Sequence, residues 1–121
     1  MINNVRERTP MPQQDIQRRC TNFDEVDLGY TEMDAIREAM RCLKCRKKPC
    51  TTGCPIGQRI PAFIERVSEG DFAGAYEVIM GQSSLPAVCG RVCPQEEQCE
   101  KNCAQAVRGE AVGIGRLERF V

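Results

Sequence analysis

The sequence predicts an all-α domain of short helices and loops, and three observations support that fold class. No stretch of the 121 residues alternates apolar and polar side chains for long enough to make a convincing strand. One stretch that starts near residue 31 and two between residues 60 and 81 instead repeat apolar side chains at helical spacing. Eight of the nine cysteines fall in two dense blocks, 42–54 and 89–103, and the segment between the blocks is long enough for two helices.

Residues 1–19 are predicted to form an extended N-terminal arm. They mix Pro, Gln and Arg and show no sustained apolar period. Such a segment is either a solvated tail or an arm that packs on a partner domain, and the sequence leaves both interpretations open.

The first predicted helix begins at Thr31, which with Asp34 resembles a helix N-cap. We expect this helix to deliver Cys42 and Cys45 at its C-terminal end. The apolar residues at helical spacing are Met33, Ile36, Met40 and Leu43.

Two further helices are predicted between the cysteine blocks. Pro61 sits where a first helical turn tolerates proline, and Gly70 stops that helix. Asp71 can cap the next helix, which ends at Gly81. Each of these two helices has a stripe of apolar residues at helical spacing, and the two stripes indicate a core that holds the cysteine blocks together. The residues expected to face inward are Ile60, Phe63, Ile64 and Val67 in one helix and Phe72, Ala75, Tyr76 and Ile79 in the other.

The chain restarts at Leu85-Pro86, and Gly109 precedes a last amphipathic run, AVGIGRLERFV. Val121 falls inside this helical pattern with no stop signal, so we expect a longer protein to continue beyond it.

Composition and charge exclude several classes of function. Seventeen basic and seventeen acidic residues balance, and no basic strip is interleaved with aromatics, so we expect no nucleic-acid partner. No apolar run approaches the ~20 residues that span a bilayer, and the N-terminus lacks a signal-peptide region. We therefore expect no membrane partner and a cytoplasmic location. Reducing thiol pools there disfavour disulfides, so clustered cysteines indicate metal ligands.

Soft four-thiolate sites suit zinc or an iron-sulfur cluster. Zinc sites usually present two CxxC pairs, whereas each block here holds four cysteines and only the first opens with CxxC. Cys54 and Cys93 are each followed by Pro, as is the last cysteine of the bacterial ferredoxin run. The pattern favours two iron-sulfur centres; a structural zinc domain that mediates protein contacts and a disulfide framework are the alternatives.

The blocks RCLKCRKKPCTTGCP and LPAVCGRVCPQEEQCEKNC, read together with IGRLERF, resemble a known module. It is the N-terminal iron-sulfur domain of the NADPH-dependent glutamate synthase small (beta) chain family. Ferredoxin:NADP oxidoreductase large subunits and dihydropyrimidine dehydrogenase share this module. The resemblance covers residues 20–121 and implies an alpha-helical ferredoxin-like fold around two 4Fe-4S clusters. Carried over by position, one cluster uses Cys42, Cys45, Cys50 and Cys103, and the other uses Cys54, Cys93, Cys99 and Glu118.

The fourth ligand of the second cluster has two candidates. Spacing alone nominates Cys89, whereas the resemblance implies Glu118. Glu118 lies on the apolar stripe of the last helix, where a carboxylate must find a partner or lose its charge. The alternative is a salt bridge to Arg116, to Arg119 or to an arginine elsewhere in the chain. Cys20, far from both blocks, is expected to stay unligated.

Basic residues around the first block have two interpretations. They offset the negative charge of a cluster and tune its potential, or they form a solvated loop. These residues are Arg41, Lys44, Arg46, Lys47 and Lys48.

No nucleophile and base are paired for catalysis, so the sequence predicts no catalytic residue. The resemblance implies that the domain passes electrons in an oxidoreductase whose FAD and NADPH bind to C-terminal domains that follow it. It implies glutamate synthase first, with the large subunit as partner and glutamate biosynthesis as the process. A ferredoxin:NADP oxidoreductase or a pyrimidine-reducing relative is the alternative.

Overall fold

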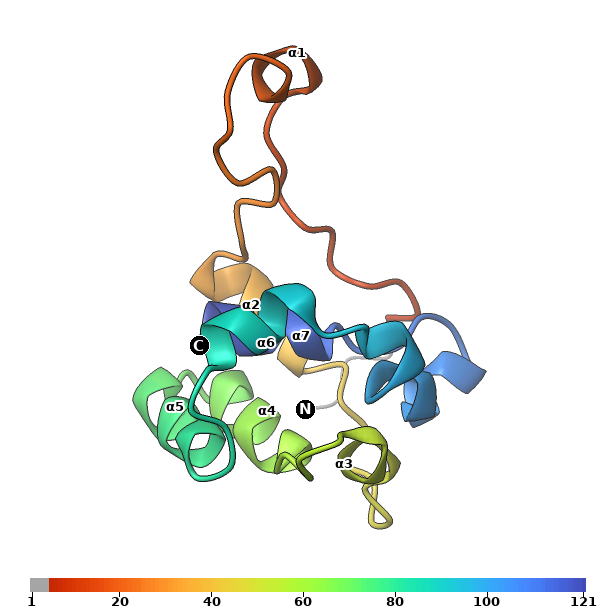
Figure 1. Cartoon of the computed structure of the whole chain (residues 1–121). Helices are drawn as coiled ribbons and strands as arrows, with labels where there is room; N and C mark the ends of the chain where they lie inside the picture. The colour runs from red at the N-terminus through yellow and green to blue at the C-terminus, as the bar shows by residue number, and fades with distance from the viewer. Residues whose placement is uncertain (1–4) are drawn as a thin grey trace.

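The computed structural model describes residues 5–121, in which short helices are joined by loops (Figure 1). In the described part of the chain the only β pairing is one isolated bridge, between Gln13 and Asp27. The all-α prediction is confirmed. The α-helices are α1 (Ile16–Arg19), α2 (Glu32–Ala39), α3 (Pro49–Gly53), α4 (Ile60–Ser68), α5 (Phe72–Met80), α6 (Pro86–Val92) and α7 (Ile114–Phe120), and the 3-10 helices are η1 (Gln95–Glu97), η2 (Glu100–Asn102) and η3 (Ala104–Val107).

Helix α2 begins as the sequence predicts. The Asp34 N–H donates to Thr31 Oγ1 and the Thr31 N–H donates to Asp34 Oδ2, both at 3.2 Å, which completes a capping box. Its buried face differs from the predicted stripe: Met33 is 71% exposed, whereas Ala35, Glu38 and Ala39 are buried. The helix ends at Ala39, so the first two cysteines of the block lie in the loop that follows rather than on the helix.

Helices α4 and α5 pack side by side and supply much of the core (Figure 1). All four residues predicted to face inward in α4 are buried. In α5, Asp71 caps the first turn by accepting the Gly74 N–H at 2.9 Å, and Ala75 and Ile79 are buried. The prediction for Tyr76 is wrong: it is 45% exposed, because it follows Ala75 by about 100° of helix rotation.

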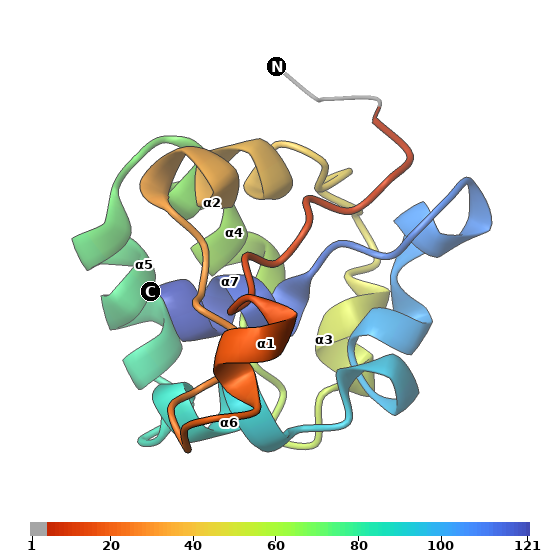
Figure 2. The ribbon, with the colours of Figure 1, turned by 90° about the horizontal axis from the view of Figure 1, so that it is seen from above.

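Helix α7 crosses the middle of the body and packs closely on α6 (Figure 2). Ile114 and Leu117 are buried in the core, and Phe120 packs edge-on against Phe72 of α5, with ring centroids 5.0 Å apart. Gly90 permits the contact between α6 and α7, since a Cβ there would stand 2.7 Å from the Arg119 backbone nitrogen. The final amphipathic run therefore organises the centre of the domain.

Residues 12–28 form an N-terminal hairpin that projects from the body, with α1 at its tip (Figure 1). The Leu28 N–H donates to Pro12 O at 2.8 Å, and the Gln14 N–H donates to Val26 O at 2.9 Å. Asp15 caps α1. The predicted arm, residues 1–19, thus includes one short helix among residues 5–19, and residues 1–4 lie outside the described part.

A buried ion pair joins three segments of the body. Glu38 and Arg41 are both 0% exposed and meet at 2.5 Å. Glu38 also accepts the backbone N–H groups of Thr9 (2.7 Å) and Gly113 (2.8 Å). Arg41 donates to Arg6 O at 3.0 Å, among other carbonyls. These hydrogen bonds hold α2 against the segment that enters α7.

None of the helices in the described residues is long and apolar enough to cross a membrane.

Candidate metal centre

The structure brings together the four cysteines predicted for the first cluster. Cys42 and Cys45 lie in the loop after α2, Cys50 is in the first turn of α3, and Cys103 lies between η2 and η3. All four line one small cavity, although Cys103 is more than 50 residues from the others. The apolar walls of the cavity come from α4, α7 and the segment before α7, and include Ile60, Ile64, Val112 and Ile114.

These thiols lie in a poorly hydrated place. Burial raises the pKa of the Cys42 thiol, and it raises the pKa of Cys50 to about 11. Charge on Cys103 would raise both values further, because its thiol lies near the other two. A thiol must lose its proton to bind metal, so loading this cavity is coupled to proton release.

The residues predicted as ligands of the second cluster lie on or beside short helices. Cys54 follows α3, Cys93 follows α6, Cys99 precedes η2, and Glu118 lies on α7. Burial raises the pKa of Cys93, and nearby Cys89, Glu118 and Cys54 raise it further. Burial also raises the pKa of Cys99 to about 12, with Glu100 and Cys54 adding to the rise. Cys93 thus lies near Cys54 and Glu118, and Cys99 lies near Cys54.

Both candidates for the fourth ligand border Cys93, but their surroundings differ. Cys89 lies 3.9 Å from Ser83 Oγ and also contacts Cys93. Glu118 is half-buried, and burial raises the pKa of its carboxyl to about 7. Within the described residues its carboxylate makes no hydrogen bond or ion pair.

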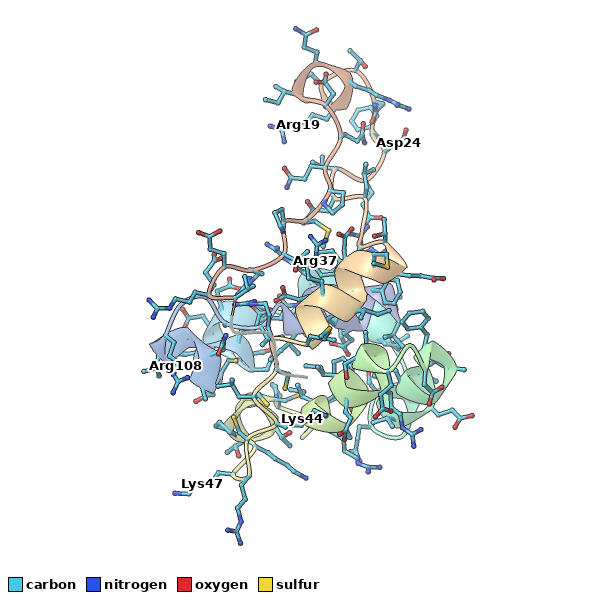
Figure 3. The ribbon with its side chains drawn as sticks, turned by 180° about the vertical axis from the view of Figure 1, so that it is seen from behind. Arg19, Asp24, Arg37, Lys44, Lys47 and Arg108 are labelled. Carbon is cyan, nitrogen blue, oxygen red and sulfur yellow. The ribbon has the colours of Figure 1, made fainter. Side chains whose placement is uncertain are left out.

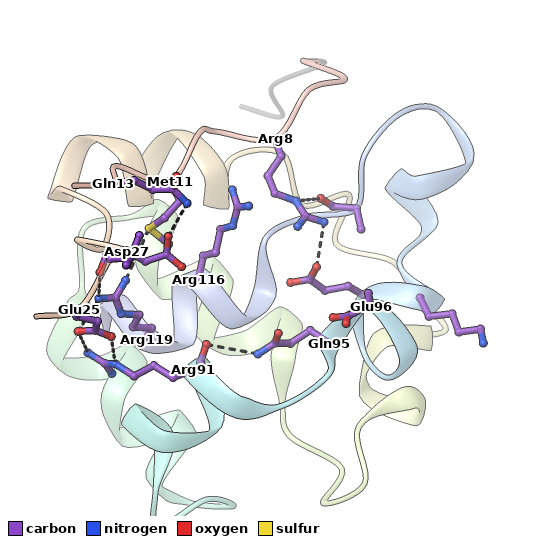
Figure 4. Close-up of a pocket in the computed structure, with 15 residues that line it drawn as sticks. Arg8, Met11, Gln13, Glu25, Asp27, Arg91, Gln95, Glu96, Arg116 and Arg119 are labelled. Atoms are coloured by element: carbon purple, nitrogen blue, oxygen red, sulfur yellow. Dashed lines mark hydrogen bonds and ion pairs between the residues drawn. The ribbon is translucent and has the colours of Figure 1, made fainter. Parts of the chain in front are cut away.

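The salt-bridge alternative for Glu118 is wrong. Arg116 Nη1 donates to Thr9 O at 3.0 Å, and Arg119 Nη2 pairs with Glu25 at 3.0 Å. Both guanidinium groups turn toward the N-terminal segment (Figure 4). Within the described residues the Glu118 carboxylate therefore has no hydrogen-bond or ion-pair partner, and it lies near the Cys93 thiol.

The two ligand sets interlock along the chain. Cys50 and Cys54 flank the body of α3, about 6 Å apart at 1.5 Å per helical residue. Cys99 and Cys103 flank η2 in the same manner. Helices α3 and η2 pack on each other, and a Cβ at Gly53 would collide with Asn102. Each of the two helices thus carries or adjoins one predicted ligand of each set.

The spacing of these ligands differs from that of a single-ion site. A tetrahedral zinc site needs sulfur ligands about 2.3 Å from one ion. Across residues 5–121, no group of three or more Cys, Asp or Glu is arranged to hold one metal ion. A four-iron cluster binds each thiolate at a different iron and so needs wider spacing. None of the nine cysteines forms a disulfide, and Cys20 is exposed in the hairpin.

The basic residues of the first block divide into two kinds. Arg41 is buried against Glu38, so its charge is already balanced within the core. Lys44 pairs with Glu65 at 2.8 Å on the surface. Arg46, Lys47 and Lys48 are exposed, as a solvated loop would be (Figure 3).

The sequence analysis missed Glu100, which is buried beside Cys99. Its carboxylate pairs with Arg8 at 2.9 Å and accepts the Gly115 N–H at 3.3 Å. Burial raises the pKa of this carboxyl. Nothing local predicts its role, because its partner Arg8 lies 92 residues earlier in the chain.

A helical domain that gathers cysteines from two distant blocks around one cavity is of the class of iron-sulfur proteins. The chain belongs to the family described as dihydropyrimidine dehydrogenase domain II, 4Fe-4S cluster, which matches residues 19–121. The resemblance inferred from the motifs is confirmed, and the chain is a 4Fe-4S electron-transfer domain of the kind found in oxidoreductases.

Several relatives share this domain. The chain is 40% identical over 111 residues to the NAD-dependent dihydropyrimidine dehydrogenase subunit PreT of Escherichia coli K12, which covers 92% of this chain and 26% of that protein. It is 40% identical over 103 residues to the glutamate synthase (NADPH) small chain of Halomonas elongata, and the match covers 85% of this chain and 22% of that protein. The glutamate synthase (NADPH) small chain of Azospirillum brasilense is 36% identical to this chain over 105 residues, and the match covers 85% of this chain and 22% of that protein. The chain thus spans about a quarter of the length of these curated relatives.

Proposed function

We propose that this domain carries single electrons through two 4Fe-4S clusters inside an NAD(P)H- and FAD-dependent oxidoreductase. The observation that carries the proposal is the cavity lined by four thiols from both cysteine blocks. Each cluster, when bound, supplies a reversible one-electron couple. The chain itself supplies ligands, an apolar surround and a fixed separation between the two centres.

The ligand assignment is part of this proposal. Cys42, Cys45, Cys50 and Cys103 hold the first cluster, and Cys54, Cys93, Cys99 and Glu118 hold the second. Glu118 is preferred to Cys89 because its carboxylate is half-buried and unpartnered, whereas a buried thiol is stable without a ligand. Because α3 carries one ligand of each set, the centres lie close enough for a short electron transfer step.

Iron and sulfide analysis of the anaerobically purified protein tests the proposal. We expect about eight irons and eight sulfides per chain, two times the content of one 4Fe-4S cluster. Dithionite should bleach a broad brown absorbance and produce the electron paramagnetic resonance (EPR) signal of reduced clusters. A colourless protein with two zinc ions and no sulfide would contradict it and would favour a structural zinc domain.

The finer assignment concerns the enzyme that contains the domain. We propose FAD- and NADPH-binding domains C-terminal to residue 121, in a cytoplasmic enzyme of the glutamate synthase small-chain type with the large subunit as electron acceptor. The 40% identity to a glutamate synthase small chain supports this, and the equal identity to PreT supports a pyrimidine-reducing enzyme as the second candidate.

Electron acceptors distinguish these two candidates. The intact enzyme, reduced by NADPH or NADH, is offered either 2-oxoglutarate and glutamine with a large subunit, or uracil with its partner subunit. Glutamate formation supports the first candidate, and dihydrouracil formation supports the second.

A further inference from the structure

A cleft of about 580 Å³ separates the N-terminal hairpin from the body (Figure 4). Met11, Glu25 and Asp27 line its hairpin side, and Arg91 of α6 and Arg119 of α7 line the opposite side. Contacts across this cleft join Met11, Glu25 and Asp27 to α6 and α7, the two helices that carry or adjoin proposed ligands of the second set.

One carboxylate makes the central contact. Glu25 Oε1 accepts from Arg91 Nε at 2.5 Å, and Glu25 Oε2 lies 3.3 Å from Arg91 Nη2 and 3.0 Å from Arg119 Nη2. The hairpin therefore bridges a guanidinium group on α6 and another on α7 through a single side chain.

Arg119 is the better-buried of the two arginines. Its side chain is 8% exposed, against 42% for that of Arg91. It also donates to Asp27 O at 2.6 Å and approaches Met11 Sδ at 3.7 Å. The C-terminal turn of α7 is thereby held against three residues of the hairpin side.

Both bridged arginines stand next to ligands of the second set. Arg91 precedes Cys93 by two residues, and Arg119 directly follows Glu118. Helices α6 and α7 are seven residues each, and neither has a side-chain cap at its N-terminus. Helices this short depend on tertiary contacts for their orientation.

We propose that Glu25 is a positioning residue for the second cluster, whose carboxylate ties α6 to α7 and so keeps Cys93 and Glu118 at the spacing the cluster needs. This inference rests on the proposed ligand assignment. The first set has no such contact, because its cavity is lined by none of the hairpin residues.

The test compares the two clusters within one protein. Glu25→Gln, in the intact and anaerobically purified protein, keeps the side-chain shape and removes the charge. Under a fixed chelator concentration, we expect loss of the second cluster to accelerate about three- to fivefold. Loss of the first cluster should keep its rate. The EPR signal and midpoint potential of the second cluster should also change.

Asp24→Asn is the matched control. It makes the same change of charge one residue away, and within the described residues the Asp24 carboxylate has no hydrogen-bond or ion-pair partner. We expect both clusters to behave as in the wild type. A second check is Arg91→Gln: if Glu25 acts partly through Arg91, the effect of Glu25→Gln shrinks in that background.

Equal acceleration for both clusters would overturn the inference, because it would indicate general destabilisation. No change in either cluster would overturn it as well. A wild-type protein with no second cluster in the iron and sulfide analysis would instead contradict the proposed function, so the two failures are distinguishable.

Discussion

The two ligand sets differ in how the protein holds them. The first set consists of four thiols around a cavity with apolar walls, and Arg41 of the buried Glu38–Arg41 pair directly precedes Cys42 in the chain. The second consists of three thiols and a carboxylate at the ends of short helices, with the N-terminal hairpin bound outside. The first site is therefore supported by the core, and the second depends on contacts between distant segments.

Removal of both clusters should have the largest effect on the fold. It should also distinguish the helices that depend on the clusters from those that belong to the apolar core. Neither α3 nor α6 contains a buried residue, whereas α4 buries four. After chelation of the oxidised protein, we expect amide hydrogen exchange to become fast in α3 and α6 and to stay slow in α4. The helical circular dichroism signal should fall. Uniform protection would mean that both sites fold without metal.

Glu38→Ala should have the next largest effect, centred on the first site. It leaves the Arg41 charge buried and unpaired, at a cost of about 3–5 kcal/mol in unfolding free energy. The midpoint of anaerobic urea unfolding measures this loss, and the first cluster should be released before the second. Glu32→Ala, on the exposed side of the same helix, serves as the control with a loss below about 1 kcal/mol.

Glu118→Ala should affect the second site alone. Without its carboxylate ligand the second cluster should be lost or converted, while the first keeps its EPR signal. Iron content should fall by up to about half, from the count expected for two clusters. Loss of both clusters in parallel would remove the distinction between the two sites.

Cys89→Ser should have the smallest effect. Cys89 lies beside Cys93, but we assign the ligand role to Glu118, so both clusters should remain at wild-type iron and sulfide content. A protein that loses its second cluster in Cys89→Ser and keeps it in Glu118→Ala would reverse this assignment.

Local signals predicted much of the fold correctly. The capping box at Thr31 and the apolar stripe of α4 depend only on residues within a few positions of one another, so the sequence shows them directly. The prediction that Tyr76 faces inward was wrong. In a nine-residue helix the apolar stripe is short, so the burial of residues at its edges is ambiguous from the sequence.

Long-range pairing could not be predicted in the same way. Only the family resemblance joined Cys103 to the first block. No pattern connects Glu25 with Arg91, or Arg8 with Glu100, because each pair meets only after the chain has folded. The sequence analysis grouped Arg41 with the other basic residues of the first block. Its burial depends on the ion pair with Glu38, three residues earlier, which the sequence analysis did not consider.

The shared use of α3 and η2 has a consequence for protein engineering. Under the proposed assignment, a fragment that retains the four ligands of the first cluster spans residues 42–103, and so it also retains Cys54, Cys93 and Cys99 of the other set. Truncation alone therefore cannot leave the first cluster without ligands of the second. A version that holds only the first cluster has to be made by side-chain substitution, whereas a chain that starts at Cys54 keeps only Cys103 of the first set.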